Sequence, residues 1–191
     1  MTGVASLGRD LAPKRLELLH DILPKATVLG LLVNPSNPAL TRSTIEAAEA
    51  AAHTLGLELE VFRASRDRDF ESVFAGLARA RASGLVIAID SFFTGRRKRL
   101  AALALDHAVP AIYQYRDFAA AGGVMSYGGN LEEPFRLISL YTARLLNGER
   151  PADLPIELAA KIELIVNVKA ANSLKISVPP LLLSRADEVI E

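Results

Sequence analysis

The chain has 191 residues, half of them hydrophobic, which is enough to bury a substantial core as one domain or a two-lobed unit. It contains 22 Lys and Arg residues and 22 Asp and Glu residues, and this zero net charge argues against nucleic acid or an anionic membrane as a partner. No run reaches the roughly 18 apolar residues of a membrane span, and the lack of cysteine excludes disulfides, thiolate nucleophiles and cysteine-ligated metals.

The predicted elements alternate between helices and strands. The apolar run 28–33 stops abruptly at Asn34-Pro35-Ser36-Asn37-Pro38, which is typical of a strand buried on both faces. Helices are expected over 10–23, 39–55, 67–82, 93–108, 117–121, 131–146 and 170–174, and strands over 28–33, 57–62, 85–89, 111–115, 124–127 and 162–168. This regular alternation predicts the α/β class, with a Rossmann-like, doubly wound parallel sheet flanked by helices.

Several kinds of catalytic or cofactor site lack their sequence signals. The chain has no glycine-rich dinucleotide or phosphate loop and no G-x-S-x-G elbow. His20, His53 and His107 fall in or at the ends of predicted helices, without a second ligand at metal-binding spacing. We therefore expect no catalytic residue, no metal and no cofactor. The cationic run 96–99 is interpreted as a solvated helix face, with a phosphate- or partner-binding patch as the alternative.

Polar and aromatic side chains follow several predicted strands at their carboxyl ends, which converge on one edge of a parallel sheet. Such a mixture suits a small polar solute: a carboxylate for an ammonium group, amides or a guanidinium for a carboxylate, and rings for an apolar part. The alternative is that these side chains only shape turns, cap helices or pack in the core. The candidate ligand-binding residues are Asn34, Ser36, Asn37, Asp90, Ser91, Tyr113, Tyr115, Arg116 and Tyr127.

A series of landmarks along the chain resembles the ABC-transporter substrate-binding proteins related to tryptophan and tyrosine uptake. They are 2–4 with 13–19, the Asn-Pro loop 34–38, 111–113 followed by 121–128, 151–155, 163–167 and the C-terminal 185–191. The resemblance covers essentially the whole chain. It implies a type I periplasmic binding protein, in which two Rossmann-like lobes close over a ligand and the loaded form docks on a membrane permease. It also implies a non-enzymatic, periplasmic or membrane-anchored extracytoplasmic protein.

The chain departs from that family at its front. Members carry a signal or lipoprotein peptide and a whole N-terminal lobe before the Thr2-Gly3-Val4 landmark, whereas here Met1 stands directly before it and no signal peptide is seen. We therefore expect a C-terminal lobe plus returning segments. The division is 1–123 for the ligand-binding lobe, 124–150 for a segment returning to the missing lobe, and 151–191 for a crossover strand, short helix and tail.

The helix expected over 131–146, within the segment that returns to the missing lobe, predicts self-association. An apolar face without a first lobe to cover it should be hidden in a homo-oligomer, or by folding the helix back onto its own sheet. The residues of this face are Leu131, Phe135, Ile138, Leu145 and Leu146.

The function that these observations favour is recognition of a small polar metabolite, an amino acid or similar compound, by hinge closure in an ABC uptake system. One alternative is a small Rossmann-like enzyme, which would need a catalytic pair or a cofactor fingerprint. The other is a ligand-sensing regulatory lobe, which would need a DNA-binding helix-turn-helix.

Overall fold

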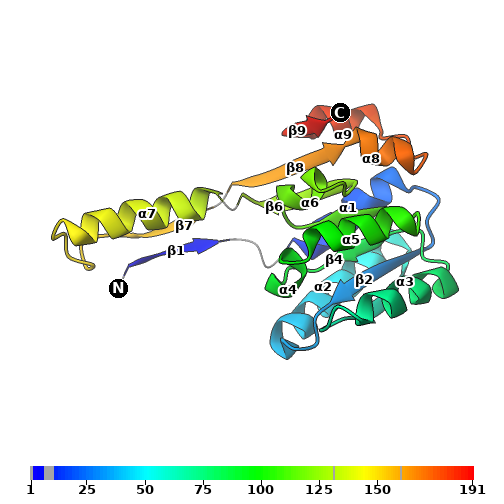
Figure 1. Ribbon diagram of the computed structural model, residues 1–191, viewed down its shortest axis with the longest axis horizontal. Coiled ribbons are helices and arrows are strands. Elements are labelled where there is room, and N and C mark those ends of the chain that lie inside the picture. The colour runs from blue at the N-terminus through cyan, green and yellow to red at the C-terminus, as the bar shows by residue number, and fades with distance from the viewer. Residues whose placement is uncertain (1, 7–10, 131, 160) are drawn as a thin grey trace.

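The computed structural model describes residues 2–6, 11–130, 132–159 and 161–191, and it divides into a body and a projecting arm (Figure 1). The body contains a seven-stranded sheet between two layers of helices, and the arm contains one helix and a two-stranded sheet. Among the described residues, no helix combines the length and apolarity needed to cross a bilayer.

The strands of the body are β2 (Val28–Val33), β3 (Glu58–Arg63), β4 (Leu85–Ile87), β5 (Ala111–Tyr113), β6 (Met125–Gly129), β8 (Ile162–Asn167) and β9 (Glu188–Ile190). Their order is β3-β2-β4-β5-β6-β8-β9, and every pairing is parallel except that of β6 with β8. The predicted α/β class with a Rossmann-like, mostly parallel sheet is therefore confirmed. β8 runs against β6 because the chain leaves the body after β6 and returns from the arm at the start of β8 (Figure 1).

Helices cover both faces of this sheet. One face carries α1 (Ala12–Ile22), α2 (Pro38–Leu55), α8 (Val168–Ser173) and α9 (Pro180–Arg185), and the other carries α3 (Asp69–Ala80), α4 (Ser91–Thr94), α5 (Arg97–Asp106) and α6 (Arg116–Ala120). Successive side chains of β2 point to opposite faces, so Leu31 packs in the first core cluster and Leu32 in the second. A strand covered on both faces has no polar side, which explains the continuous apolar run.

Three segments that are far apart in the sequence form the arm. β1 (Gly3–Ser6) pairs in parallel with β7 (Ile156–Ala159), and α7 (Glu132–Leu146) packs on both strands. Tyr141 of α7 is buried, and its hydroxyl donates a hydrogen bond to the backbone oxygen of Pro155 at 2.9 Å. The chain therefore passes between body and arm after β1, after β6 and after β7 (Figure 1).

The structure differs from the expected division at β1 and β7, which lie in the arm rather than with 1–123 and 151–191, and at the strand 124–127. The strand at 124–127 was grouped with the helix after it, but β6 is hydrogen-bonded to β5 on one side and to β8 on the other, inside the body. The grouping is wrong for this strand because its side chains complete the body's core, where Val124 and Met125 are buried. The helix of the same segment does lie outside the body, as α7.

α7 does not fold back onto the sheet of the body. Of the apolar face expected on it, Phe135, Ile138 and Leu146 are exposed, and Leu145 is half-buried. Leu131 lies outside the described residues. The predicted helix at 93–108 is divided into α4 and α5, and β1, β7, β9 and α9 were not expected from the sequence.

Candidate functional site

The carboxyl ends of β2, β4, β5 and β6 lie along one edge of the sheet, at the side where the chain leaves for the arm (Figure 1). We call this edge the rim. Its loops are residues 34–37 after β2, 88–91 after β4, 114–116 after β5, and 129–130 at the end of β6. All nine predicted site residues belong to these loops or to the strands that lead into them.

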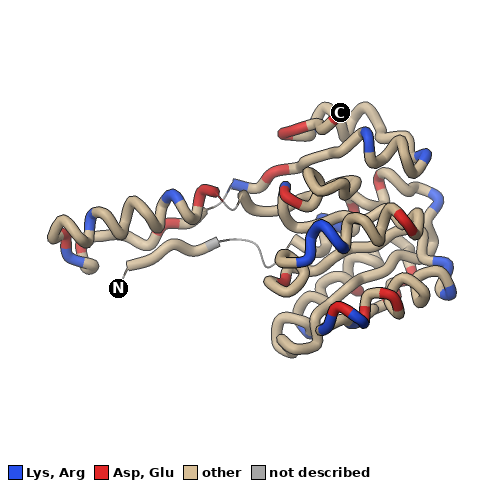
Figure 2. The backbone as a smooth tube through the Cα atoms, viewed as in Figure 1, with Lys and Arg blue, Asp and Glu red and all other residues tan. Residues whose placement is uncertain are grey.

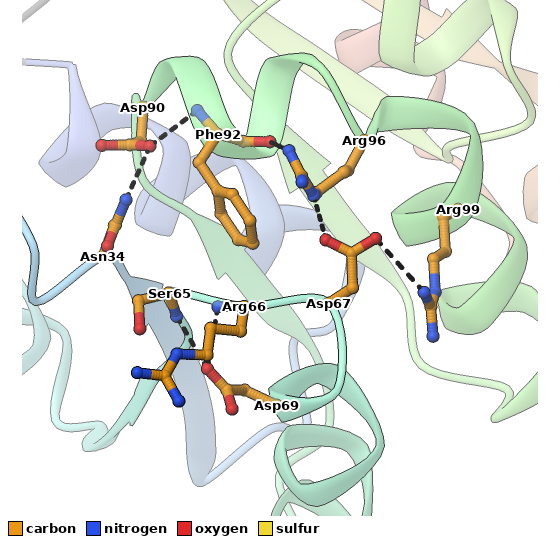
Figure 3. Close-up of polar contacts among 9 residues, drawn as sticks. All are labelled: Asn34, Ser65, Arg66, Asp67, Asp69, Asp90, Phe92, Arg96 and Arg99. Carbon is orange, nitrogen blue, oxygen red and sulfur yellow. Dashed lines mark hydrogen bonds and ion pairs between the residues drawn. The ribbon is translucent and has the colours of Figure 1, made fainter.

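Asn34 and Asp90 come from different loops and meet at the rim (Figure 3). Asn34 Nδ2 donates a hydrogen bond to Asp90 Oδ1 at 2.9 Å, and the same oxygen accepts the backbone N–H of Phe92 at 2.8 Å. Asn34 Oδ1 accepts the backbone N–H of Ser36 at 3.0 Å. Both side chains thus shape their loops, as the alternative interpretation holds. Asp90 Oδ2, however, accepts no hydrogen bond from any described residue.

Three other predicted residues occupy the same two loops. Asn37 caps α2, because its Oδ1 accepts the backbone N–H of Leu40 at 3.4 Å. The side chains of Ser36 and Ser91 are exposed, and no described hydrogen bond engages either hydroxyl. The structure therefore brings these serines to the rim without tying them to the Asn34–Asp90 pair.

Tyr113 does not lie on the rim. It is fully buried, and its ring stacks on Phe118 with centroids 4.7 Å apart, within the second core cluster. Burial raises the pKa of its phenol, whose oxygen has no hydrogen-bond partner among the described residues. The prediction that this side chain lines the site is wrong, because its position in β5 turns it toward the face covered by α6.

Tyr115 and Arg116 line a cavity of about 190 Å³ at the ends of β5 and β6. The Arg116 guanidinium donates two hydrogen bonds to Glu188, at 2.6 and 2.5 Å, and this contact raises the pKa of Arg116. Tyr127, the last of the predicted residues, is half-buried and packs against the first core cluster. The other residues that line the cavity are Asp117, Gly129, Asn130, Glu132, Glu163 and Glu188.

The cationic run 96–99 is not simply solvated. Arg96 and Arg99 both form ion pairs with Asp67, which precedes α3 (Figure 3). The Arg96 guanidinium also lies 4.0 Å from the centre of the Phe92 ring. Together with the packing of its ring on Phe70 and Phe93, these contacts fix Phe92 against the second core cluster. In Figure 2 basic and acidic residues are mixed along the body and the arm, which fits the zero net charge.

Sequence reasoning missed Arg15, which is buried in α1 behind the strands that lead to the rim. From the first turns of α1, its Nε donates to the backbone oxygen of Tyr127 at 3.1 Å and its Nη1 to that of Ile87 at 3.2 Å. Burial lowers the pKa of Arg15 to about 10. A signal existed in the sequence, because Arg15 shares the apolar stripe of α1 with Leu19 and Ile22, where a charge is unusual.

The rim offers hydrogen-bonding and ionic groups without an evident metal centre. In the ranges that the structure describes, no group of three or more His, Asp or Glu side chains is placed to hold a metal ion. The arrangement provides an amide, a carboxylate with one oxygen not engaged, the guanidinium of Arg116 and the ring of Tyr115. This set can orient a small polar molecule by non-covalent contacts.

The family model for ABC transporter substrate binding proteins matches residues 1–190. The chain belongs to this family. Solved structures share its fold: a conserved domain protein from Vibrio cholerae is 24% identical with a TM-score of 0.82, over 98% of this chain and 62% of that one. An ABC domain from Streptococcus pneumoniae in complex with L-Trp is 21% identical with a TM-score of 0.81, over 99% of this chain and 64% of that one.

A ligand-free, open substrate-binding protein with adhesive properties from Clostridium difficile is 20% identical with a TM-score of 0.67, over 99% of this chain and 62% of that one. The ABC substrate-binding chain described here thus spans 62 to 64% of the length of these three structures. No curated protein sequence matches it.

Proposed function

We propose that this chain is the ligand-recognising part of the solute-binding component of an ABC uptake system, and that its ligand is a small zwitterion of the amino-acid type. The observation that carries the proposal is the Asn34–Asp90 pair, with Asp90 Oδ2 unengaged among the described residues. A carboxylate oxygen so placed suits an ammonium group, and the ring of Tyr115, which lines the cavity at the ends of β5 and β6, suits an apolar side chain. The L-Trp complex of the Streptococcus pneumoniae relative supports this ligand class.

The same proposal includes how the ligand is held and delivered. Because the rim is open on the side of the arm, the ligand would be closed in by a second lobe, and closure would change the surface presented to a membrane permease. The three passages of the chain between body and arm support a hinge at this place. We also propose that the body is the ligand-binding lobe, that the arm formed by β1, α7 and β7 is the part that returns to the other lobe, and that the protein is extracytoplasmic.

Amino-acid binding can be tested by titrating the isotope-labelled chain with L-tryptophan, L-tyrosine and the other amino acids while recording backbone amide spectra. We expect weak binding, since this chain supplies the contacts on one side of the ligand only, and we expect shifts confined to the rim loops. A chain whose spectrum no amino acid alters at millimolar concentration would contradict the proposed ligand class.

Replacing Asp90 by Ala tests the residue that carries the proposal. In a closed two-lobed protein the loss should be about 2 to 5 kcal/mol, because a ligand ammonium would be buried without its partner. In the chain alone the loss is smaller, because the rim stays wet. Asp21→Ala, at an exposed position of α1, is the matched control and should bind as the unmodified chain does. If Asp90→Ala and the control bind the amino acid equally well, Asp90 serves only as the N-cap of α4.

A further inference from the structure

A second, smaller cavity adjoins the Asn34–Asp90 pair, between the carboxyl ends of β2 and β4 and the first turns of α2. Its volume is about 10 Å³, which is the space that a single water-sized group needs. The polar part of its lining comes from Asn34, Asn37, Thr41, Thr44 and Asp90, and the rest is aliphatic. The cavity is therefore large enough for one small polar group and for nothing bulkier.

Most of the polar side chains around this cavity already have partners within the protein. Asn34 donates to Asp90 through Nδ2, and its Oδ1 accepts a backbone N–H of its own loop. Thr41 Oγ1 donates to the backbone oxygen of Asn34 at 2.6 Å. Asn37 Oδ1 accepts the backbone N–H of Leu40 at 3.4 Å. These groups shape the loop and the start of α2, and they do not call for a further partner.

Thr44 and Asp90 differ from the other polar residues of the lining. Thr44 is only 4% exposed, yet no hydrogen bond of the described residues engages its hydroxyl. The remaining partner of a hydroxyl enclosed to this degree is whatever occupies the cavity. Asp90 uses Oδ1 for both of its described side-chain hydrogen bonds, which leaves Oδ2 open. The cavity thus offers a hydroxyl oxygen and a carboxylate oxygen to its occupant.

We propose that this cavity receives a primary ammonium group of the ligand, held by Thr44 together with Asp90, an assignment that rests on the proposed function. An ammonium group is close to water in size, and its N–H groups need acceptors of this kind. An anion would meet the charge of Asp90 instead. Methyl groups on the nitrogen remove donors and need space that the cavity lacks. The subsite therefore selects amino acids over the corresponding betaines.

The test compares L-tryptophan with its Nα-trimethyl derivative, which keeps the carboxylate, the positive charge and the indole ring. Backbone amide spectra of the full chain, of Thr44→Val and of Thr44→Ser are recorded during titration with each probe. We expect the unmodified chain to bind L-tryptophan at least about tenfold more tightly than the derivative. Thr44→Val keeps the shape but not the hydroxyl, so it should bind L-tryptophan about fivefold more weakly and the derivative as before. Thr44→Ser should keep the preference.

A matched control separates this role from a structural one. Thr54→Val makes the same change at an exposed position of the same helix and should bind both probes as the unmodified chain does. Urea transitions check that each variant folds. Equal weakening of both probes in Thr44→Val would mean that Thr44 only supports α2, and would overturn the proposal. Equal binding of both probes by the unmodified chain would also overturn it.

A second measurement does not depend on an amino acid. The chain is titrated with ammonium chloride and, at the same ionic strength, with tetramethylammonium chloride. We expect amide shifts at Thr44 and Asp90 with ammonium alone, and their loss in Thr44→Val. Shifts that are absent, or that are the same with both salts, would overturn the proposal. If no amino acid binds any variant, the proposed function fails, and the ammonium titration still decides whether this cavity takes a primary ammonium group.

Discussion

Gly128 of β6 lies against the backbone of Gln114, the residue that follows β5. A Cβ atom added there would lie 1.9 Å from the backbone oxygen of Gln114, far inside contact distance. The carbonyl belongs to the backbone and cannot rotate away, so Gly128→Ala should push β6 from β5 and open the rim. We expect the free energy of unfolding, measured by urea denaturation, to fall by about 1 to 3 kcal/mol.

Gly3 provides the matched control for this substitution, because a Cβ there has no neighbour within 4 Å. Gly3→Ala should leave the urea midpoint nearly unchanged. A Gly128→Ala variant as stable as this control would show that the two strands can separate at little cost, contrary to the packing described above.

The candidate site could be predicted from the sequence only for residues whose place is set by their position at the end of a strand. Asn34 and Asp90 follow buried strands, and the rule that strand ends converge was enough to place them together. Tyr113 was misplaced because the rule does not say to which face the last residue of a strand turns. Arg15 was missed because its role depends on carbonyl groups of β4 and β6, which the helical pattern of α1 cannot reveal.

At the scale of single elements, the loop before α3 depends on one carboxylate. Asp69 Oδ2 accepts the backbone N–H groups of Ser65 at 3.0 Å and Arg66 at 2.8 Å (Figure 3). The hydrogen bond from Ser65, followed by that from Arg66, lowers the pKa of Asp69 below its ordinary value. The ionised form is therefore favoured in the folded state, so its stabilising effect is present above the unfolded pKa and is lost as the pH falls through the folded one.

We therefore expect Asp69→Asn to lower the urea midpoint at neutral pH and to differ less from the unmodified chain as the pH falls below about 4. Urea transitions of both proteins across the acid range measure this. Most of the difference should persist when salt is added, because the backbone N–H of Ser65 has the largest effect on this pKa and the charges of Arg68 and Arg66 have the smallest. A difference that is the same at every pH would show that packing, and not the ionised carboxylate, is responsible.

Elements with a long apolar pattern were the predictable ones. β2 was located to the residue because its six residues are apolar throughout and end at a proline-rich turn. β1, β7 and β9 were not expected, since each has three or four residues and takes its structure from a distant partner strand. The antiparallel direction of β8 likewise depends on the path of the chain through the arm.

At the scale of the whole molecule, the arm leaves several large apolar side chains exposed to solvent. Ile156 and Leu158, on one face of β7, are 64% and 53% exposed, and Leu146 of α7 is 83% exposed. Parallel sheets are normally covered on both faces, and a sheet of two strands is marginal alone. Burial stabilises by about 25 cal/mol per Å² of apolar surface, so leaving several such side chains in water loses several kcal/mol of stabilisation.

We propose that two copies of this chain associate through their arms, because the outer face of β7 in one copy can cover that of the other. Light scattering at micromolar concentration should then give a dimer or larger assembly. Leu158→Glu should dissociate it by placing a charge in the contact, whereas Leu181→Glu, at a 71% exposed position in α9 of the body, should not. A monomer whose arm amides exchange slowly with solvent would refute the proposal, since the arm would then be stable uncovered.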